Sequence, residues 1–302
     1  MLRANEGPPM QHEIDANGRT RTYTLVEPRA AHGRRDLVLV FHGSRQDGRR
    51  HRRFTGGAFD VLATRDGAVV AYLDGHRGNW NDARPESRFP ARLDGIDDVA
   101  FTRAVIDRLV ATHAVDPRRV FAVGYSNGGQ MVMRLMHETP VAIAGAAVVA
   151  ATLPEPGGLL LSSPGPATPM PVVLVHGTRD PIAPYTGGPM ARWARALFKV
   201  GGTSLSAPET ASYFARRNRI EVTPTSARVP AATPGRPRTW VERTEHQQDG
   251  RPSVVLYTVH GGGHTVPGPA RAPRVLGRTT SDISTADVMG WAFGITTPTS
   301  VA

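Results

Sequence analysis

Ser126 lies between two glycines in a sequence context that is typical of a catalytic nucleophile. Residues 124–128 read Gly-Tyr-Ser-Asn-Gly and follow a run of strand-forming residues, while Gln130 to His137 favour a helix. A serine in such a sharp strand-to-helix turn presents its hydroxyl as a nucleophile at the top of a sheet. Gly124 and Gly128 remove side chains that would collide where the chain folds back. The pattern predicts nucleophilic catalysis by Ser126, although the pentapeptide alone is weak in a chain with 32 glycines.

A serine nucleophile needs a base and an acid that orients the base, and the chain offers both in a meaningful order. In the α/β-hydrolase fold the serine is followed by the acid and then by the histidine. Asp180 lies just past a predicted buried strand, and His264 lies in a glycine-rich loop beyond the last predicted strand. We expect Ser126, Asp180 and His264 to form a catalytic triad. The backbone amides of Ser44, in an early strand-to-helix loop, and of Asn127 would form the oxyanion hole.

Each of these assignments has a plainer alternative. Ser126 could be a surface serine in a glycine-rich turn, and Asp180 could form a turn before Pro181. His260 could serve as the base in place of His264. These two histidines are four residues apart, a spacing that on a helix would suggest a metal pair. Three intervening glycines argue against a helix there, so we expect neither a metal nor another cofactor.

The elements that must position these residues predict an α/β architecture. Continuous apolar runs are typical of strands buried on both faces of a parallel sheet, and they alternate with stretches typical of helices. The expected strands are 21–26 at an edge, 37–41, 68–73, 119 to the elbow, 142–152, 172–177, 240–246 and 253–260, and the expected helices are 59–64, 95–114, 130–137, 209–218 and one opened by a capping box at 284–287. We expect an α/β-hydrolase fold, with a mainly parallel central sheet and helices on both faces. It would form a single domain over 20–296, between a flexible segment 1–19 and a tail 297–302.

Composition excludes several classes of protein and site. The 302 residues include no cysteine, which excludes disulfides, thiolate metal sites and a cysteine nucleophile. The net charge of +10 comes from dispersed arginines and one lysine, without the basic motifs of RNA-binding proteins, so we expect no nucleic-acid partner. No apolar run is long enough to predict a membrane span. The first residues lack an apolar secretion segment, which favours a cytoplasmic location. The sequence does not predict an oligomeric state.

Taken together, the motifs resemble those of the secreted poly(3-hydroxybutyrate) depolymerase and feruloyl esterase family, including LpqC-like proteins. The matching segments are Phe41 to Gly43, Asp94 to Val99, Val115 to Val120, Ser126 to Gly129, His176 to Asp180 and Gly261 to Thr265, within a resemblance over about residues 20–295. The resemblance implies a serine esterase that acts on a polyester or on acyl and phenolic esters of plant polysaccharides. It also implies secretion. The candidates for substrate binding are His42, Tyr125 and Trp80. Alternatively, His42 could form structural hydrogen bonds beside the oxyanion loop, and Trp80 could lie buried in the core.

The chain departs from this family at two places. Val266 stands where the family usually has tryptophan, which bears on the clamp for the acyl or aromatic group. The segment 88–92 stands near the place of a frequent cysteine pair, which loosens the loop 74–94. We expect this loop and 182–208 to shape the pocket, whereas 154–171 carries no recognisable chemistry. Two other functions stay open: a serine peptidase or acyltransferase on the same fold, and a non-catalytic basic polymer-binding protein.

Overall fold

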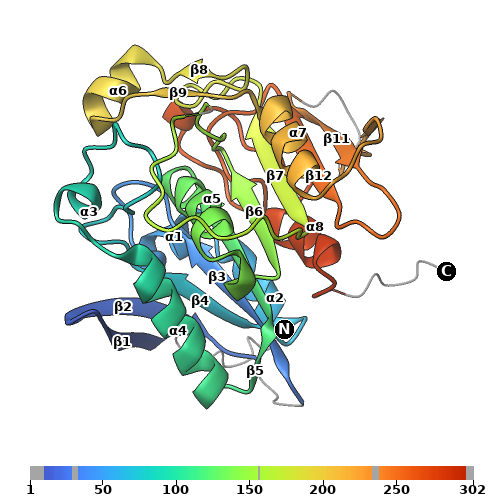
Figure 1. Ribbon diagram of the computed structural model, residues 1–302. Helices are drawn as coiled ribbons and strands as arrows, with labels where there is room; N and C mark the ends of the chain where they lie inside the picture. Colours follow the sequence, from blue (N-terminus) through green and yellow to red (C-terminus); the bar gives the residue numbers. More distant parts are fainter. Residues whose placement is uncertain (1–9, 29–32, 156, 233–237, 297–302) are drawn as a thin grey trace.

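The computed structural model describes residues 10–28, 33–155, 157–232 and 238–296, and its centre is a ten-stranded sheet (Figure 1). The strands are β1 (Met10–Ala16), β2 (Arg19–Val26), β3 (Arg35–Phe41), β4 (Val69–Leu73), β5 (Val115–Tyr125), β6 (Gly145–Val149), β7 (Val172–Gly177), β10 (Thr225–Arg228), β11 (Trp240–His246) and β12 (Val254–His260). Their order is β1-β2-β4-β3-β5-β6-β7-β12-β11-β10. Neighbouring strands from β4 to β12 pair in parallel, and the outer pairs are antiparallel. The predicted α/β-hydrolase fold with a mainly parallel sheet is confirmed.

Helices cover both faces of this sheet. They are α1 (Gly48–Phe54), α2 (Val61–Thr64), α3 (Pro90–Leu93), α4 (Asp98–Thr112), α5 (Asn127–Glu138), α6 (Arg192–Phe198), α7 (Ala207–Arg217) and α8 (Thr285–Ala292), with short 3-10 turns η1 (Ala58–Asp60), η2 (Pro140–Ala142) and η3 (Arg274–Leu276). Figure 1 shows α4, α5 and α7 in front of the sheet, and α2 and α8 behind it. A small ribbon of β8 (Gly188–Pro189) and β9 (Thr203–Ser204) lies beside α6.

The two faces of the sheet bury two separate apolar cores. Along β3, Leu37, Leu39 and Phe41 belong to the core under α4 and α5, while Val38 and Val40 belong to the core under α2 and α8. A strand buried on both faces needs apolar residues at every position, because successive side chains point to opposite faces. This packing explains why the central strands are the elements most easily predicted from the sequence.

The amino-terminal edge differs from the prediction. The segment 21–26 is not an edge strand, because β1 pairs with β2 along its full length and takes the edge position itself. The expectation of a flexible segment up to residue 19 is therefore wrong from residue 10 onward. In β1 only Ile14 and Ala16 are buried, so its alternation is too short to stand out. Residues 1–9 and the predicted tail 297–302 lie outside the described residues.

Two further elements have no clear signal in the sequence. The helix α1 carries arginines instead of an apolar stripe, and it begins where the Asp47 side chain accepts a hydrogen bond from the Arg50 amide. The strand β10 is exposed along its whole length, so burial imposes no alternation on it. The single helix expected over 59–64 is divided between η1 and α2.

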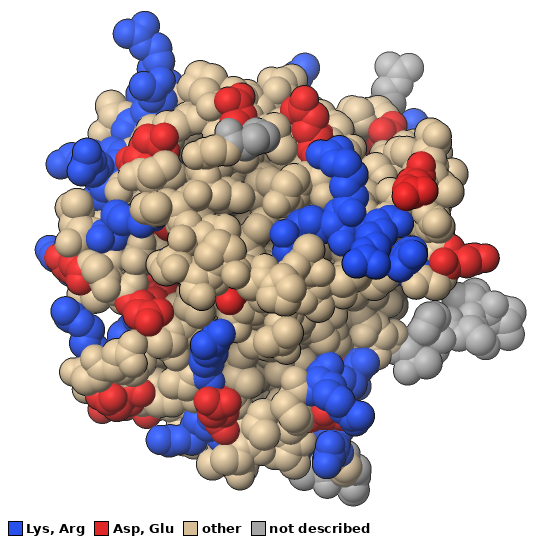
Figure 2. All heavy atoms as spheres, in the orientation of Figure 1, with Lys and Arg blue, Asp and Glu red and all other residues tan. Residues whose placement is uncertain are grey.

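Charges of both signs are spread over the molecule. Figure 2 shows basic and acidic side chains interspersed on one face, with one larger group of basic side chains right of the centre. Several arginines are neutralised locally, for example Arg65 by Asp66 and Arg118 by Asp116. Within the described ranges, no helix combines the length and the apolar character needed to cross a bilayer.

Candidate active site

The elbow that carries Ser126 is built where β5 ends and α5 begins. Ser126 has φ 54° and ψ −117°, a strained conformation for a residue with a side chain. The Ser126 amide donates to the Val149 carbonyl of β6 at 2.9 Å, and the Gln130 amide donates to the Ser126 carbonyl at 3.1 Å. The sheet and the helix thus hold the strained residue from both sides.

The two glycines of the elbow are required by close backbone approach. A Cβ on Gly124 would lie 2.2 Å from the carbonyl oxygen of Gly128, as the sequence predicts for a chain that folds back on itself. A Cβ on Gly128 would lie 2.1 Å from the carbonyl oxygen of Phe41. The second collision is therefore with the end of β3 and not within the elbow. Because Gly128 has no side chain, the start of α5 can pack directly against the end of β3, the strand that leads to Ser44.

Three loops bring Ser126, Asp180 and His264 together. The Ser126 Oγ lies 2.9 Å from Nε2 of His264, and Nδ1 of His264 lies 2.7 Å from Oδ2 of Asp180. The three residues follow β5, β7 and β12, which are parallel strands, so their carboxyl ends meet at the same edge. The imidazole is 4% exposed and the carboxylate 0%. The arrangement allows a proton to move from Oγ to Nε2 while the carboxylate accepts from Nδ1–H.

The Asp180 carboxylate is both ionised and fixed in place. Its Oδ1 accepts hydrogen bonds from the amides of Ile182 and Ala183, each at 2.8 Å, so Asp180 forms a turn and also reaches the histidine. Burial favours the neutral acid, but the charge and hydrogen bond of His264 outweigh it and lower the pKa of Asp180 below its ordinary value. The buried His176 donates from Nε2 to the Ala183 carbonyl at 2.9 Å, which braces the same turn.

His260, the alternative base, is engaged elsewhere. Its ring stacks on Trp240 with the centroids 3.6 Å apart, and its Nε2 lies 3.9 Å from Glu242. In contrast, the amide of His264 donates to the Leu276 carbonyl at 2.7 Å, which holds the loop with the imidazole toward the serine. Among the described residues, no three His, Asp or Glu side chains form a group suited to a metal ion.

Ser44 and Asn127 line the same cavity as Ser126, as expected for the two amides of an oxyanion hole. Asn127 is the first residue of α5, and no side chain caps this helix start. Its amide is therefore suited to an anion. The peptide before Ser44 is fixed by His42, whose Nδ1 donates to the Gly43 carbonyl at 2.7 Å. Since N–H and C=O of a trans peptide point in opposite directions, this bond also fixes the direction of the Ser44 amide.

The three residues predicted to bind substrate lie behind the cavity and not on its wall. His42 and Trp80 are 0% exposed and Tyr125 is 5% exposed, and none of them is a lining residue in the described part of the chain. Trp80 donates from Nε1 to the His42 carbonyl at 2.9 Å, and His42 Nε2 accepts from the Gly75 amide at 2.8 Å. The assignment to substrate binding is corrected: these side chains support the oxyanion loop and the histidine loop from within the core, in agreement with the alternatives given for His42 and Trp80.

Removing the Tyr125 hydroxyl tests this corrected position. The hydroxyl donates to the His264 carbonyl at 2.9 Å, so Tyr125→Phe removes one hydrogen bond from the loop that carries the base. We expect kcat to fall about two- to tenfold while KM stays unchanged, because substrate contacts are untouched. Steady-state kinetics on a p-nitrophenyl ester measure both constants. A several-fold rise in KM at unchanged kcat would restore Tyr125 as a substrate-binding residue.

Burial of His42 also predicts an acid-sensitive fold. Burial lowers the pKa of His42 to about 4, whereas an unfolded histidine titrates near 6.5. The unfolded state therefore takes up a proton first, and the free energy of unfolding falls as the pH drops from about 6.5 toward 4, by about 3 kcal/mol from this residue. Urea unfolding at a series of pH values should show a shallower fall for His42→Gln than for the wild type. An equal fall in the two proteins would contradict the assignment.

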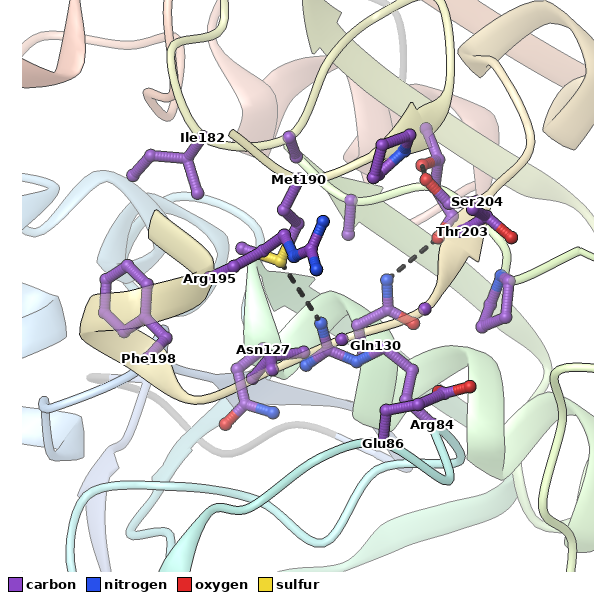
Figure 3. A pocket seen from close by; sticks show the side chains of 18 of the residues that line it. Arg84, Glu86, Asn127, Gln130, Ile182, Met190, Arg195, Phe198, Thr203 and Ser204 are labelled. Atoms are coloured by element: carbon purple, nitrogen blue, oxygen red, sulfur yellow. Dashed lines mark hydrogen bonds between the residues drawn. The ribbon is translucent and has the colours of Figure 1, made fainter. Parts of the chain in front are cut away.

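The catalytic cavity has a volume of about 460 Å³ (Figure 3). Both loops predicted to shape it, 74–94 and 182–208, supply wall residues, and so do Pro154, Glu155, Gly157 and Gly158, whose chemistry the sequence does not reveal. Figure 3 shows Met190 and Arg195 across the cavity from α5. The wall residues that the sequence prediction missed include Arg84, Glu86, Phe89, Gln130, Glu155, Ile182, Met190, Arg195 and Phe198. They share no motif, because a wall built from separate loops and helices requires no fixed spacing along the chain.

One wall of the cavity is tied to the elbow through a buried carboxylate. The Asn127 side chain donates to Oδ2 of Asp82 at 2.6 Å and accepts from the Trp80 amide at 2.8 Å. Asp82 is 0% exposed and accepts two further hydrogen bonds from the Arg84 guanidinium. The buried charge is therefore paired, as a stable interior requires. Asn127, the residue after the nucleophile, thus fixes the position of the loop from Trp80 to Arg84 relative to the elbow.

Comparisons with known proteins agree with this fold. The family model described as Phospholipase/Carboxylesterase matches residues 90–200. The protein named "Putative esterase NocK" from Nocardia uniformis subsp. tsuyamanensis is 37% identical over 284 residues, which cover 91% of this chain and 79% of that protein. Feruloyl esterase B from Piromyces equi is 30% identical over 213 residues, 70% of this chain and 36% of that protein. The solved acetyl xylan esterase from Aspergillus awamori is similar in fold, with a TM-score of 0.63 and 17% identity over 95% of this chain and 100% of that one.

Proposed function

This chain belongs to the α/β-hydrolase esterases of the feruloyl esterase type and is a carboxylic ester hydrolase, and on that premise we propose that it cleaves phenolic acyl esters of plant polysaccharides through an acyl-enzyme on Ser126. The observation that carries the proposal is the relay from Ser126 Oγ through His264 to Asp180, with contacts of 2.9 and 2.7 Å. Each atom in this relay has the partner that nucleophilic acyl transfer requires.

The first half of the proposed reaction forms the acyl-enzyme. Nε2 of His264 takes the hydroxyl proton as Ser126 Oγ attacks the ester carbonyl, and the Asp180 carboxylate stabilises the imidazolium that results. The carbonyl oxygen becomes an oxyanion, and the amides of Ser44 and Asn127 donate hydrogen bonds to it. The tetrahedral intermediate then collapses. His264 returns its proton to the leaving alcohol oxygen, which departs with the polysaccharide.

The second half releases the acid and regenerates the serine. A water molecule takes the place of the alcohol, and Nε2 of His264 accepts one of its protons as the water oxygen attacks the acyl carbonyl. The same two amides stabilise the second oxyanion. Collapse of this intermediate breaks the bond to Ser126 Oγ, which receives the proton from His264. The products are the free carboxylic acid and the original enzyme.

The walls of the cavity support an aromatic acyl group over a small one. A volume of about 460 Å³ exceeds what an acetyl group needs and lies within the range of cavities that bind small molecules. Phe89, Ile182, Met190 and Phe198 supply apolar surface on its walls, and methionine and aromatic side chains pack well against a phenyl ring. The similarity to Feruloyl esterase B also supports this choice of substrate.

A fluorophosphonate probe tests the nucleophile directly. The probe phosphonylates an activated serine, and peptide mapping identifies the labelled residue. We expect labelling at Ser126 in the wild type, none in Ser126→Ala and strongly reduced labelling in His264→Ala. A folded wild-type protein that stays unlabelled at Ser126 would overturn the proposed mechanism.

A substrate panel tests the acyl group and the remaining alternatives. We expect a higher kcat/KM for methyl ferulate than for a 3-hydroxybutyrate oligomer, and no cleavage of a peptide amide. Higher activity on the oligomer would favour a polyester substrate, and cleavage of the amide would favour a peptidase. Transfer of the feruloyl group to an added alcohol in preference to water would identify an acyltransferase.

A further inference from the structure

A second hollow in the surface, distinct from the catalytic cavity, is lined by five arginines. This arginine depression has a volume of about 1070 Å³ and shares no lining residue with the catalytic cavity. Its arginines, all exposed, are Arg179, Arg238, Arg271, Arg274 and Arg278. Within the described part of the chain, no acidic residue lines the depression and none of the five arginines forms an ion pair.

Among the described residues, the absence of carboxylate partners distinguishes these arginines from many others. Elsewhere, carboxylates neutralise Arg52, Arg65 and Arg119, among others. Five like charges around one concave surface repel each other, and the concave shape concentrates their field. A ligand that carries several negative charges would relieve this repulsion. Because the planar guanidinium matches a carboxylate with two parallel hydrogen bonds, carboxylates are well suited to this role.

An apolar groove with an exposed tryptophan adjoins the depression. This tryptophan groove has a volume of about 610 Å³ and shares Gly268, Pro269 and Ser281 with the arginine depression. Trp291 lines it and is 54% exposed. An exposed indole offers a flat apolar face on which a sugar ring can stack while its hydroxyl groups stay in water. The continuous surface therefore combines sites for carboxylates with a site for a sugar ring.

The arginine depression also borders the loop that carries the catalytic histidine. Gly261 lines the depression, whereas His264 lines the catalytic cavity. The backbone carbonyl of Arg278 accepts from the Gly263 amide at 3.0 Å, and that of Leu276 accepts from the His264 amide. A polymer bound in the depression would therefore lie next to the active site, separated from it only by this loop.

We propose that the arginine depression and the tryptophan groove bind an acidic polysaccharide, whose uronate carboxylates pair with the arginines. The choice of a polysaccharide over another polyanion rests on the proposed function. Binding here keeps the polymer near the catalytic cavity and so raises the local concentration of its ester groups. Ester cleavage itself does not require this site. The binding site would therefore promote ester cleavage only for substrates that are acidic polymers.

Calorimetric titration with polygalacturonate tests the proposal by binding instead of activity. The test variant is the triple replacement Arg238→Gln, Arg274→Gln and Arg278→Gln, which keeps the backbone carbonyl that holds Gly263. The control variant Arg49→Gln, Arg53→Gln and Arg216→Gln removes three exposed charges outside the depression. We expect the test variant to lose at least about tenfold in affinity and the control less than about twofold. Equal losses in the two variants would overturn the site, because they would show that only net charge matters.

Further ligands decide the chemical class. Fully methyl-esterified polygalacturonate has the same sugars without the charges, and we expect it to bind at least about tenfold more weakly. Trp291→Ala should weaken polygalacturonate binding about threefold or more. Equal binding of the neutral polymer would contradict recognition of carboxylates. Tighter binding of single-stranded RNA or of anionic lipid vesicles, lost in the same test variant, would overturn the assignment to a polysaccharide.

Ser126→Ala separates this inference from the proposed catalytic function. We expect this variant to lose ester hydrolysis but to bind polygalacturonate with the affinity of the wild type. An inactive wild type that still binds the acidic polymer would leave the binding site standing and remove the proposed reaction. An active wild type without affinity for the polymer would overturn the binding site and leave the proposed reaction standing.

Discussion

Replacing His264 by alanine is expected to lower kcat/KM for a p-nitrophenyl ester by roughly 10⁴–10⁶-fold. Without the imidazole, Ser126 Oγ loses its acceptor at 2.9 Å, and the leaving alcohol loses its proton donor. Asp180 cannot substitute, because the amides of Ile182 and Ala183 hold its Oδ1 in the turn, and its Oδ2 contacts the imidazole at Nδ1, whereas Ser126 Oγ contacts Nε2. Initial rates at saturating and limiting substrate measure the loss. The small remaining activity would come from binding and the oxyanion amides.

His260→Ala is the matched control for this experiment. It removes the other histidine of the same loop region, whose ring stacks on Trp240. We expect kcat/KM to stay within about threefold of the wild type, since this ring contacts neither the serine nor the acid in the structure. A large loss in His260→Ala together with a small loss in His264→Ala would reverse the assignment of the base.

The second large effect is expected from Gly128→Ala, and it concerns the fold as well as activity. The new Cβ would lie 2.1 Å from the Phe41 carbonyl oxygen and 2.6 Å from that of His42. Because both are backbone atoms of a buried strand end, neither can turn away. We expect a loss of about 3 kcal/mol or more in the free energy of unfolding, or no folded protein, and no measurable esterase activity. Urea unfolding measures the stability.

Gly67→Ala separates backbone collision from the general effect of replacing a glycine. Gly67 has φ 78° and open space where a Cβ would be, so alanine there meets only the ordinary penalty of the left-handed region, about 1–2 kcal/mol. Its activity should match the wild type. If Gly128→Ala is no less stable than Gly67→Ala, the elbow is not seated on β3 as described.

The parts of the fold and site that depend on short-range rules could be predicted from the sequence. The stretches 37–41 of β3 and 172–175 of β7 are buried on both faces and consist of apolar residues only, so both runs are easily recognised in the sequence. The elbow requires glycine on both sides of Ser126, and the parallel sheet places the ends of β7 and β12 side by side. Asp180 and His264 could therefore be located from chain order without knowledge of any contact.

What could not be predicted depends on contacts between distant segments. A tryptophan such as Trp80 suits a cavity wall and a core equally well, and only its 0% exposure decides between them. Arg84 comes from the loop between β4 and α3 and Arg195 from α6, and no spacing along the chain predicts that these segments meet at the cavity. The edge strands β1 and β10 are less constrained by burial, so their residues carry little pattern.

The order in which the catalytic residues occur along the chain has a consequence during protein synthesis. Ser126 precedes its base by 138 residues, and His264 follows β12, the last strand along the described part of the chain. A ribosome-bound chain therefore carries the serine through the synthesis of 138 further residues without an acceptor for the hydroxyl proton. The nascent protein stays inert toward cellular esters until residue 264 has emerged and β12 has paired with β7. Reactivity of the serine is thus a chemical sign that β12 has been made and has joined the sheet.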